Sequence, residues 1–340
     1  MPGKKSKQVA SKIDTDKVYQ TTKIVDTLAD QVVPSRMIAW WELKGFVPLY
    51  KEFRKGAISE GVLRKMGDIR QIDIHFGLKG YQFGGWVSST EDKFNYLSAL
   101  AICLYDLNKV MLFYNNNIGF GILGIAFGAR GRSRAQAHYE PTTNVINLTR
   151  YKSAASYKDN PFFEKVPTKE QRFVYTGGPG ALAHEYGHFL DFTFGRGVEP
   201  YNGKLSLSGG KDSYEKGKTV YSDKYPLRQC MEELLTLICT SKGDKSAFVK
   251  RIERLKNSKR YKKYLLERCE IFARVFEQYI AYKLREKNIQ NAFLTDTKYD
   301  PILYLTPKEL SSIVPKMDEL LRHFRRYIND PQNLEQGKKK

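Results

Sequence analysis

The sequence of 340 residues predicts an α+β fold that is mainly helical, with a small sheet just before one of its helices. Two observations lead to this prediction. Apolar residues recur at helical spacing in several long segments, and two short β-type runs stand together near the middle of the chain. With 41% hydrophobic and 13% aromatic residues, the composition is that of a globular protein.

The N-terminal part is expected to consist of an arm followed by a helical layer. Residues 1–34 are polar and basic, which predicts a flexible arm. Residues 35–115 contain two amphipathic segments, Ile38 to Phe53 and Phe94 to Leu112, the second with leucines at helical spacing. We therefore expect residues 35–115 to form a helical layer.

Residues 116–300 are expected to form the core of the protein. The runs Arg134 to Tyr139 and Asn144 to Thr149 are β-type, and a turn sequence separates them, so they predict a hairpin. A glycine-rich break then precedes a helix from about Gly180 to Phe194.

The second half of the chain is expected to hold a basic insertion and three further helices. The insertion covers about residues 199–263, and its first part, Glu199 to Lys224, predicts a long surface loop. Residues 301–340 predict a final helix and a basic tail. The predicted helices of this half are Pro226–Thr240, Leu265–Arg285 and Leu310–Tyr327.

The net charge of +20 favours polyanionic partners, without choosing among nucleic acid, an anionic membrane surface and an acidic protein. The lysine-rich run from Lys242 to Lys263 could follow phosphates without reading bases, or could be a solvated helix face. No apolar stretch approaches the roughly 20 residues that span a bilayer.

The cysteines and the N-terminus indicate an intracellular protein. The four cysteines stand far apart without a CxxC pair, which argues against a cysteine zinc site and favours a reducing compartment. The N-terminus lacks the apolar region of a secretory signal. The GxGxxG run from Gly119 to Gly124 is rejected as a dinucleotide site, because the glycines that follow it prevent the helix that such a site requires.

The most distinctive motif is one helical turn, His184-Glu185-Tyr186-Gly187-His188. The HExxH spacing puts two imidazoles on one face of a helix with a carboxylate beside them. This is the geometry of two ligands of a catalytic zinc with a general base, although two exposed histidines on a surface helix would give the same pattern. Gly187 within the helix indicates close approach of another element, or a tolerated glycine.

A zinc site needs a third protein ligand. Phe194 stands where a third histidine would follow in the extended metzincin motif, so that class is excluded. Asp191 lies on the same stripe as both histidines, but its short side chain suits orientation of an imidazole better than ligation. The residues alone leave three candidates on a later helix, Glu267, Glu270 and Glu277.

Several segments resemble a known family. His184 to Asp191 resembles the HExGHxxD helix of gluzincin-type zinc metallopeptidases, which include the catalytic domain of anthrax lethal factor, and Glu270 to Glu277 resembles their glutamate helix. The nearer similarity is to zincin-like domains of large polyvalent proteins from phages and conjugative elements, which also share segments like Phe83 to Val87 and Ala137 to Thr149 in this order. The similarity covers about residues 75–320, and departs at Gly85, where we expect asparagine, and in the basic insertion.

The resemblance implies a zincin-like metallopeptidase fold with one Zn²⁺ on His184, His188 and Glu270, and with Glu185 as general base. Asp191 would orient a ligand. Two tyrosines upstream of Glu270 are positional candidates for stabilising the oxyanion, Tyr261 and Tyr264. The resemblance also suggests a strand that pairs with extended substrate. The residues of this strand are Ala135, Ala137, His138 and Tyr139, where His138 is expected to be structural rather than to reach the substrate.

The expected activity is therefore hydrolysis of a protein or peptide substrate in the cytoplasm of a bacterial host, for a protein that a virion could also carry. The alternative is a basic, nucleic-acid-associated or virion-packaged protein on a catalytically silent zincin scaffold. The net charge of +20 motivates this alternative.

Overall fold

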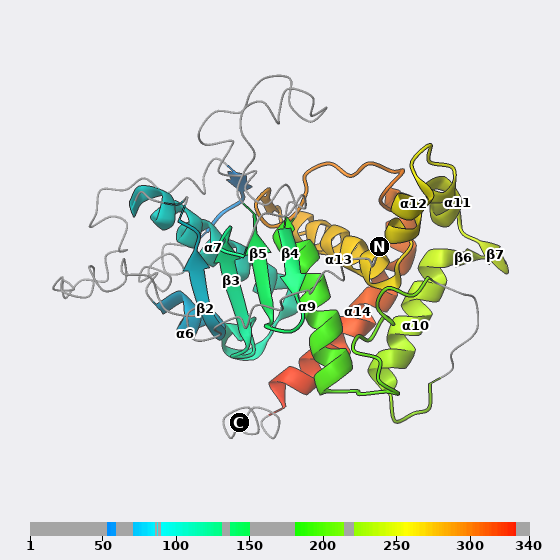
Figure 1. The fold of residues 1–340 in the computed structure, drawn as a ribbon, viewed down its shortest axis with the longest axis horizontal. Coiled ribbons are helices and arrows are strands. Elements are labelled where there is room, and N and C mark those ends of the chain that lie inside the picture. The colour runs from blue at the N-terminus through cyan, green and yellow to red at the C-terminus, as the bar shows by residue number, and fades with distance from the viewer. Residues whose placement is uncertain are drawn as a thin grey trace, which may run out of the picture.

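The computed structural model describes residues 53–58, 71–85, 87, 90–130, 137–149, 181–213 and 221–330. Within these residues the fold is α+β and mainly helical, as predicted. A sheet occupies one side of the molecule and a group of helices the other (Figure 1). The predicted arm, the basic C-terminal tail and most of the segment from Ile38 to Phe53 lie outside the described residues.

The main sheet has four strands in the spatial order β2 (Leu78–Phe83), β3 (Leu123–Phe127), β5 (Val145–Leu148) and β4 (Ala137–Glu140). The first three run parallel, and β4 pairs antiparallel with β5, so the predicted hairpin is confirmed. Strands β3 and β5 are buried along their whole length, as expected of parallel strands with both faces covered. Strand β4 is at the edge of the sheet.

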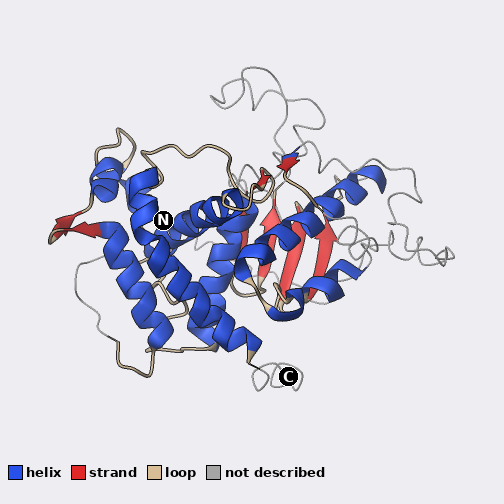
Figure 2. Ribbon diagram, turned by 180° about the vertical axis from the view of Figure 1, so that it is seen from behind, coloured by secondary structure: helices blue, strands red, loops and turns tan. Residues whose placement is uncertain are grey.

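Two helices precede and follow β2. The short α6 (Ile72–Phe76) ends at Gly77, which adopts the left-handed conformation that glycine favours at helix ends. The long α7 (Thr90–Met111) crosses one face of the sheet (Figure 2). The layer expected to be helical over residues 35–115 contains α6 and α7 and also β2, which forms because this segment pairs with β3, some forty residues further along the chain.

The remaining long helices begin and end within a few residues of the prediction. The helices are α9 (Ala181–Gly197), α10 (Pro226–Cys239), α13 (Arg268–Arg285) and α14 (Pro307–Asn329). The lysine-rich run forms two short helices, α11 (Ala247–Glu253) and α12 (Lys259–Leu265). The smaller elements are η2 (Tyr114–Asn116), the pair β1 (Arg54–Lys55) with β8 (Gln290–Asn291), and the hairpin β6 (Thr240–Ser241) with β7 (Asp244–Lys245).

Helix α9 lies beside the edge strand β4 and packs against α13 (Figure 1). Gly187 is at this helix contact, where a Cβ would lie 3.1 Å from the Cα of Ala273 and 3.3 Å from Cδ1 of Phe276. The expectation that Gly187 marks close approach of another element is therefore confirmed. Two small residues let the backbones of α9 and α13 come together.

The sequence predicted a surface loop after α9, but part of this segment is buried. The buried part consists of Ser206, Leu207 and Ser208, and it is held in the interior by hydrogen bonds to Arg228 of α10, which is itself fully buried. The Arg228 guanidinium donates hydrogen bonds to the backbone carbonyls of Glu199, Ser206, Gly195 and Lys204. One buried cation thus joins the end of α9, the segment after it and the start of α10.

Two further expectations concern what the fold lacks. The GxGxxG run leads through a turn into β3 and opens no helix, which agrees with its rejection as a dinucleotide site. Among the described residues, no helix combines the length and apolar character that crossing a bilayer requires.

Candidate metal centre

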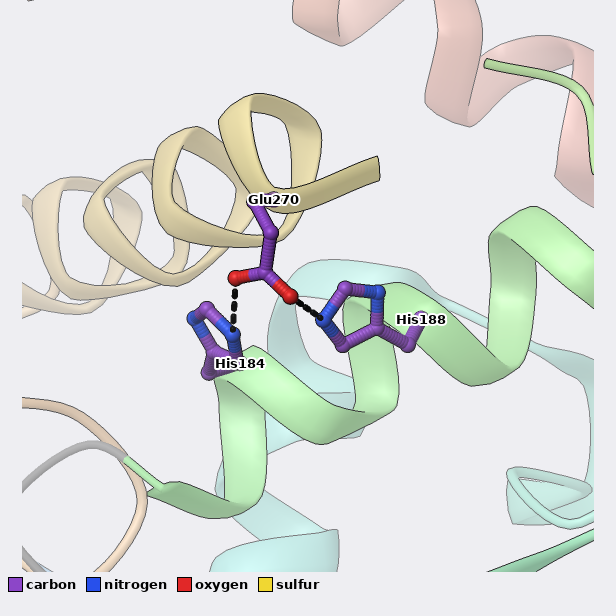
Figure 3. A group of neighbouring side chains, drawn as sticks. All are labelled: His184, His188 and Glu270. Atoms are coloured by element: carbon purple, nitrogen blue, oxygen red, sulfur yellow. Dashed lines mark ion pairs between the residues drawn. The ribbon is translucent and has the colours of Figure 1, made fainter. Parts of the chain in front are cut away.

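Two neighbouring helices bring His184, His188 and Glu270 together (Figure 3). The histidines lie one turn apart on α9, and Glu270 lies in the first turn of α13. Nε2 of His184 is 3.5 Å from Oε2 of Glu270, and Nε2 of His188 is 3.4 Å from Oε1. The three ligand atoms all lie within 4.8 Å of one another.

The charges at this centre depend on one another. Burial alone would raise the pKa of Glu270, but hydrogen bonds and charges from both imidazoles hold it well below its usual range. Burial lowers the pKa of His188, while the hydrogen bond and charge of Glu270 raise it overall to about 9. The Glu270 carboxylate is therefore ionised and faces both imidazoles. A cation bound here would take the place of the proton on His188.

The donor set fits zinc. Two imidazole nitrogens and one carboxylate oxygen form the ligand set of one class of catalytic zinc sites, which keep a further position open for water or substrate. Glu270 is also in the first turn of a helix, where the positive end of the helix dipole stabilises a carboxylate.

Only one of the three glutamates considered from the sequence faces the histidines. Glu267 is the N-cap residue of α13. Glu277 is buried two turns beyond Glu270, and its oxygens accept hydrogen bonds from the backbone N–H of Asp296 and the hydroxyl of Tyr304. The geometry thus selects Glu270 as the partner of the two imidazoles.

Glu185 is next to the triad but is not part of it. Its side chain is buried, and its charge acts on His188 and on Tyr264. The ligand group consists of His184, His188 and Glu270, without Glu185. The carboxylate of Glu185 is therefore a second carboxylate beside the triad, in the position that the HExxH motif predicts for a general base.

The two tyrosine candidates differ in position. The hydroxyl of Tyr264, on α12, is hydrogen-bonded to Glu270, and burial together with the charges of Glu270 and Glu185 raises its pKa. Tyr261 lies one turn earlier, and its electrostatic effect falls on Arg274. Both tyrosines are exposed, so the contact with Glu270 is what distinguishes Tyr264. Tyr264 is thus the tyrosine that the structure brings to the triad.

Asp191 is fully buried on α9, one turn beyond His188. Its two oxygens accept hydrogen bonds from Ser208, at 2.7 Å from the backbone nitrogen and 2.6 Å from the hydroxyl. Burial raises the pKa of Asp191, and the charge of His188 opposes this rise. Asp191 therefore ties the segment after α9 to the helix and acts on His188 through its charge.

The predicted substrate strand lies on the edge of the sheet. Ala135 is outside the described residues, whereas Ala137, His138 and Tyr139 are in β4. Nε2 of His138 lies 3.3 Å from Glu140 in the same strand, and the hydroxyl of Tyr139 donates to Asn144. In the described part of the chain, β4 pairs with β5 on one side only.

A second group of possible ligands was not foreseen from the sequence. Cys230 of α10 and Glu319 and His323 of α14 also have ligand atoms within 4.8 Å of one another. The only sequence signal is the spacing of Glu319 and His323 by four residues in one helix. Nζ of Lys316 lies 2.6 Å from Glu319, and burial raises the pKa of the Cys230 thiol to about 12.

Comparison with known families gives one result. Residues 256–328 match the family described as large polyvalent protein-associated domain 1. The matched segment includes α12, α13 and nearly all of α14, and so contains Tyr264 and Glu270 but not the HExxH turn. The match supports a link with large polyvalent proteins. No curated protein and no solved structure matches the chain.

Proposed function

We propose that this protein is a zinc-dependent metallopeptidase of gluzincin type with a zincin-like fold. The observation that carries the proposal is the position of Glu270, which offers one oxygen to each imidazole of the HExxH turn. The edge strand β4 next to α9 adds support, because an extended peptide can join a sheet at such an edge.

A zinc ion on these three residues would polarise the scissile carbonyl and lower the pKa of the attacking water to about 7. The other steps belong to residues of the chain. The carboxylate of Glu185 accepts the proton of this water and passes it to the leaving amine. The hydroxyl of Tyr264 donates a hydrogen bond to the carbonyl oxygen as negative charge develops there. Strand β4 holds the substrate extended.

The match to large polyvalent protein-associated domain 1 supports a phage or mobile-element origin for this peptidase. Its place of action in the proposal is the cytoplasm of a bacterial host, where it would arrive with DNA or within a virion.

The replacement Glu185→Gln tests the proposed function. The amide keeps the shape of the side chain but cannot take a proton, so zinc content should be unchanged while hydrolysis falls by about 10²- to 10⁴-fold. Cleavage is measured by mass spectrometry on a peptide library, with Glu286→Gln, an exposed position on the far end of α13, as the control. A wild type without zinc, or a Glu185→Gln variant that cleaves equally well, rejects the proposal.

A second candidate function is nucleic-acid association on a catalytically silent scaffold. The observations that favour it are the net charge of +20 and the exposed Lys259 and Lys263 of α12. Binding to DNA should then weaken steeply as salt rises, because each phosphate contact releases counterions. Absence of binding at low salt rejects this function.

A further inference from the structure

A cavity lies apart from the metal ligands, on the side of α13 where Ile271 points. It has a volume of about 780 Å³, within the range of about 300–1,000 Å³ usual for ligand pockets. Its walls come from the end of α10, the β6–β7 hairpin, α11, α12 and the start of α13, together with Ser213.

The floor of the cavity is apolar. Cys239, Val249 and Ile271 are buried side chains that line it, and Leu266 adds a partly buried one. Apart from the weakly polar thiol of Cys239 these groups are aliphatic, so they favour an aliphatic side chain of the ligand, which gains free energy when it is transferred from water into the cavity. Aromatic side chains do not occur among the described lining residues, so the cavity offers no surface on which a base could stack.

The rim of the cavity is basic. Four lysines and two carboxylates line it, and the carboxylates are already paired, Asp244 with Lys250 and Glu253 with Lys245, each at 2.6 Å. Lys262 donates to the backbone carbonyl of Glu253. Within the described residues, Lys259 and Lys263 form no ion pair, and both are exposed.

We propose that this cavity binds an acidic peptide segment, with one aliphatic side chain inserted into it. The apolar floor takes the aliphatic anchor, and Lys259 and Lys263 pair with carboxylates on either side of it. Helix α12 carries both these lysines and Tyr264, which links the cavity to cleavage. That link rests on the proposed function. Binding of the peptide does not depend on the proposed function.

The cavity is next to the metal centre along the chain. Leu266 and Ile271 line the cavity, and Glu270 between them faces the histidines. A protein substrate held here by an acidic segment would therefore lie against the first turn of α13, which also carries Glu270. The chemical class of substrate that follows is a protein with a glutamate- or aspartate-rich stretch around a leucine, isoleucine or valine.

The test measures binding to the full-length chain by fluorescence anisotropy. The probe is a labelled decapeptide with glutamates around a single leucine, compared with the same peptide carrying serine for leucine and with a ten-nucleotide oligothymidylate. The double variant Lys259→Ala/Lys263→Ala should weaken peptide binding by about 10-fold. The control Lys256→Ala/Arg260→Ala removes the same charge from exposed positions that do not line the cavity, and should weaken binding less than about 2-fold.

The leucine peptide should bind more tightly than its serine counterpart by about 10-fold, as expected when an aliphatic side chain leaves water. Equal loss in the two double variants, equal binding of both peptides, or tighter binding of oligothymidylate than of the peptide overturns the proposal. The same measurement on Glu185→Gln should give unchanged binding. Zinc-dependent cleavage without cavity binding rejects only this inference, and cavity binding without cleavage rejects only the proposed function.

Discussion

The described part of the chain holds two groups of side chains whose ligand atoms lie within 4.8 Å of one another, and their surroundings differ. Among the described residues, Glu270 of the first group pairs with His184 and His188 and with no lysine or arginine. Glu319 of the second group is already paired with Lys316 at 2.6 Å, and its third member is a thiol that burial keeps protonated.

Closeness of donor atoms does not by itself define a metal site. A metal at the second group would have to displace an ammonium and take a proton from a thiol whose pKa is about 12. At the first group the carboxylate is ionised, and only imidazole protons compete with the metal. Close packing of α9 on α13 also holds the first group in place, through Gly187 and Ala273.

The largest expected effect separates the two groups by zinc affinity. Glu270→Ala should lower the affinity by at least about 100-fold, since even loss of an outer partner of a ligand costs about 10- to 100-fold. Glu319→Ala should leave it unchanged. Competition with a chromophoric chelator measures both. If Glu319→Ala lost zinc and Glu270→Ala kept it, the metal would be bound by the second group and not by the first.

The next prediction concerns Glu277 of α13, whose pKa is raised, whereas that of Glu270 on the same helix is lowered. Burial raises the pKa of Glu277 to about 8, above the ordinary value of 4.5. The unfolded chain therefore loses this proton at lower pH than the folded protein, so its contribution to stability is present below pH 4.5 and is lost as pH rises to about 8.

Glu277→Gln should remove this dependence. From pH 5 to pH 8 the free energy of unfolding of the wild type should fall by about 3 kcal/mol more than that of the variant, as a raised pKa of this size implies. Urea unfolding at several pH values measures the difference. Parallel pH profiles for the two proteins would show that Glu277 is ionised in the folded state.

A smaller effect tests how firmly α9 is held. A Cβ on Gly195 would collide with the backbone of Ser206 and Leu207, whereas one on Gly197 meets nothing within 4 Å. Gly195→Ala should lower the free energy of unfolding by about 2 kcal/mol through overpacking. Gly197→Ala should change it by less than about 1 kcal/mol. Equal stability of both variants would mean that the segment after α9 does not clamp the helix.

The smallest effect concerns the second group. Cys230→Ser should change zinc affinity by less than about 2-fold, because a protonated thiol is a poor ligand. Added zinc should likewise leave the rate of alkylation of Cys230 unchanged, as followed by peptide mass spectrometry. Protection of this thiol by equimolar zinc would show that the second group binds the metal.

The sequence predicted the parts of the molecule that depend on local spacing. The helical period gave α9 and α13 to within a few residues, and the HExxH spacing placed two imidazoles on one face. The selection of Glu270 rested on a family resemblance, because three glutamates of the same helix fit equally well by spacing alone. Their different surroundings appear only when α13 is packed against α9.

The features that the sequence did not predict depend on distant contacts. Strand β2 forms because it pairs with β3, and Ser206 to Ser208 are buried because Arg228 binds their segment. Cys230 meets Glu319 and His323 because α10 packs on α14. The cavity beside α12 likewise has walls from α10, the β6–β7 hairpin, α11 and α13 as well as from α12 itself.

We have proposed that zinc binds to the imidazoles of His184 and His188 and to the carboxylate of Glu270. Zinc X-ray absorption spectroscopy on the full-length protein loaded with one equivalent tests it most directly, because zinc–nitrogen and zinc–oxygen distances of about 2.0–2.1 Å differ from a zinc–sulfur distance of about 2.3 Å. We expect a shell of nitrogen and oxygen with two imidazoles and no sulfur. A sulfur contribution in the shell, or a protein that retains no zinc, would contradict it.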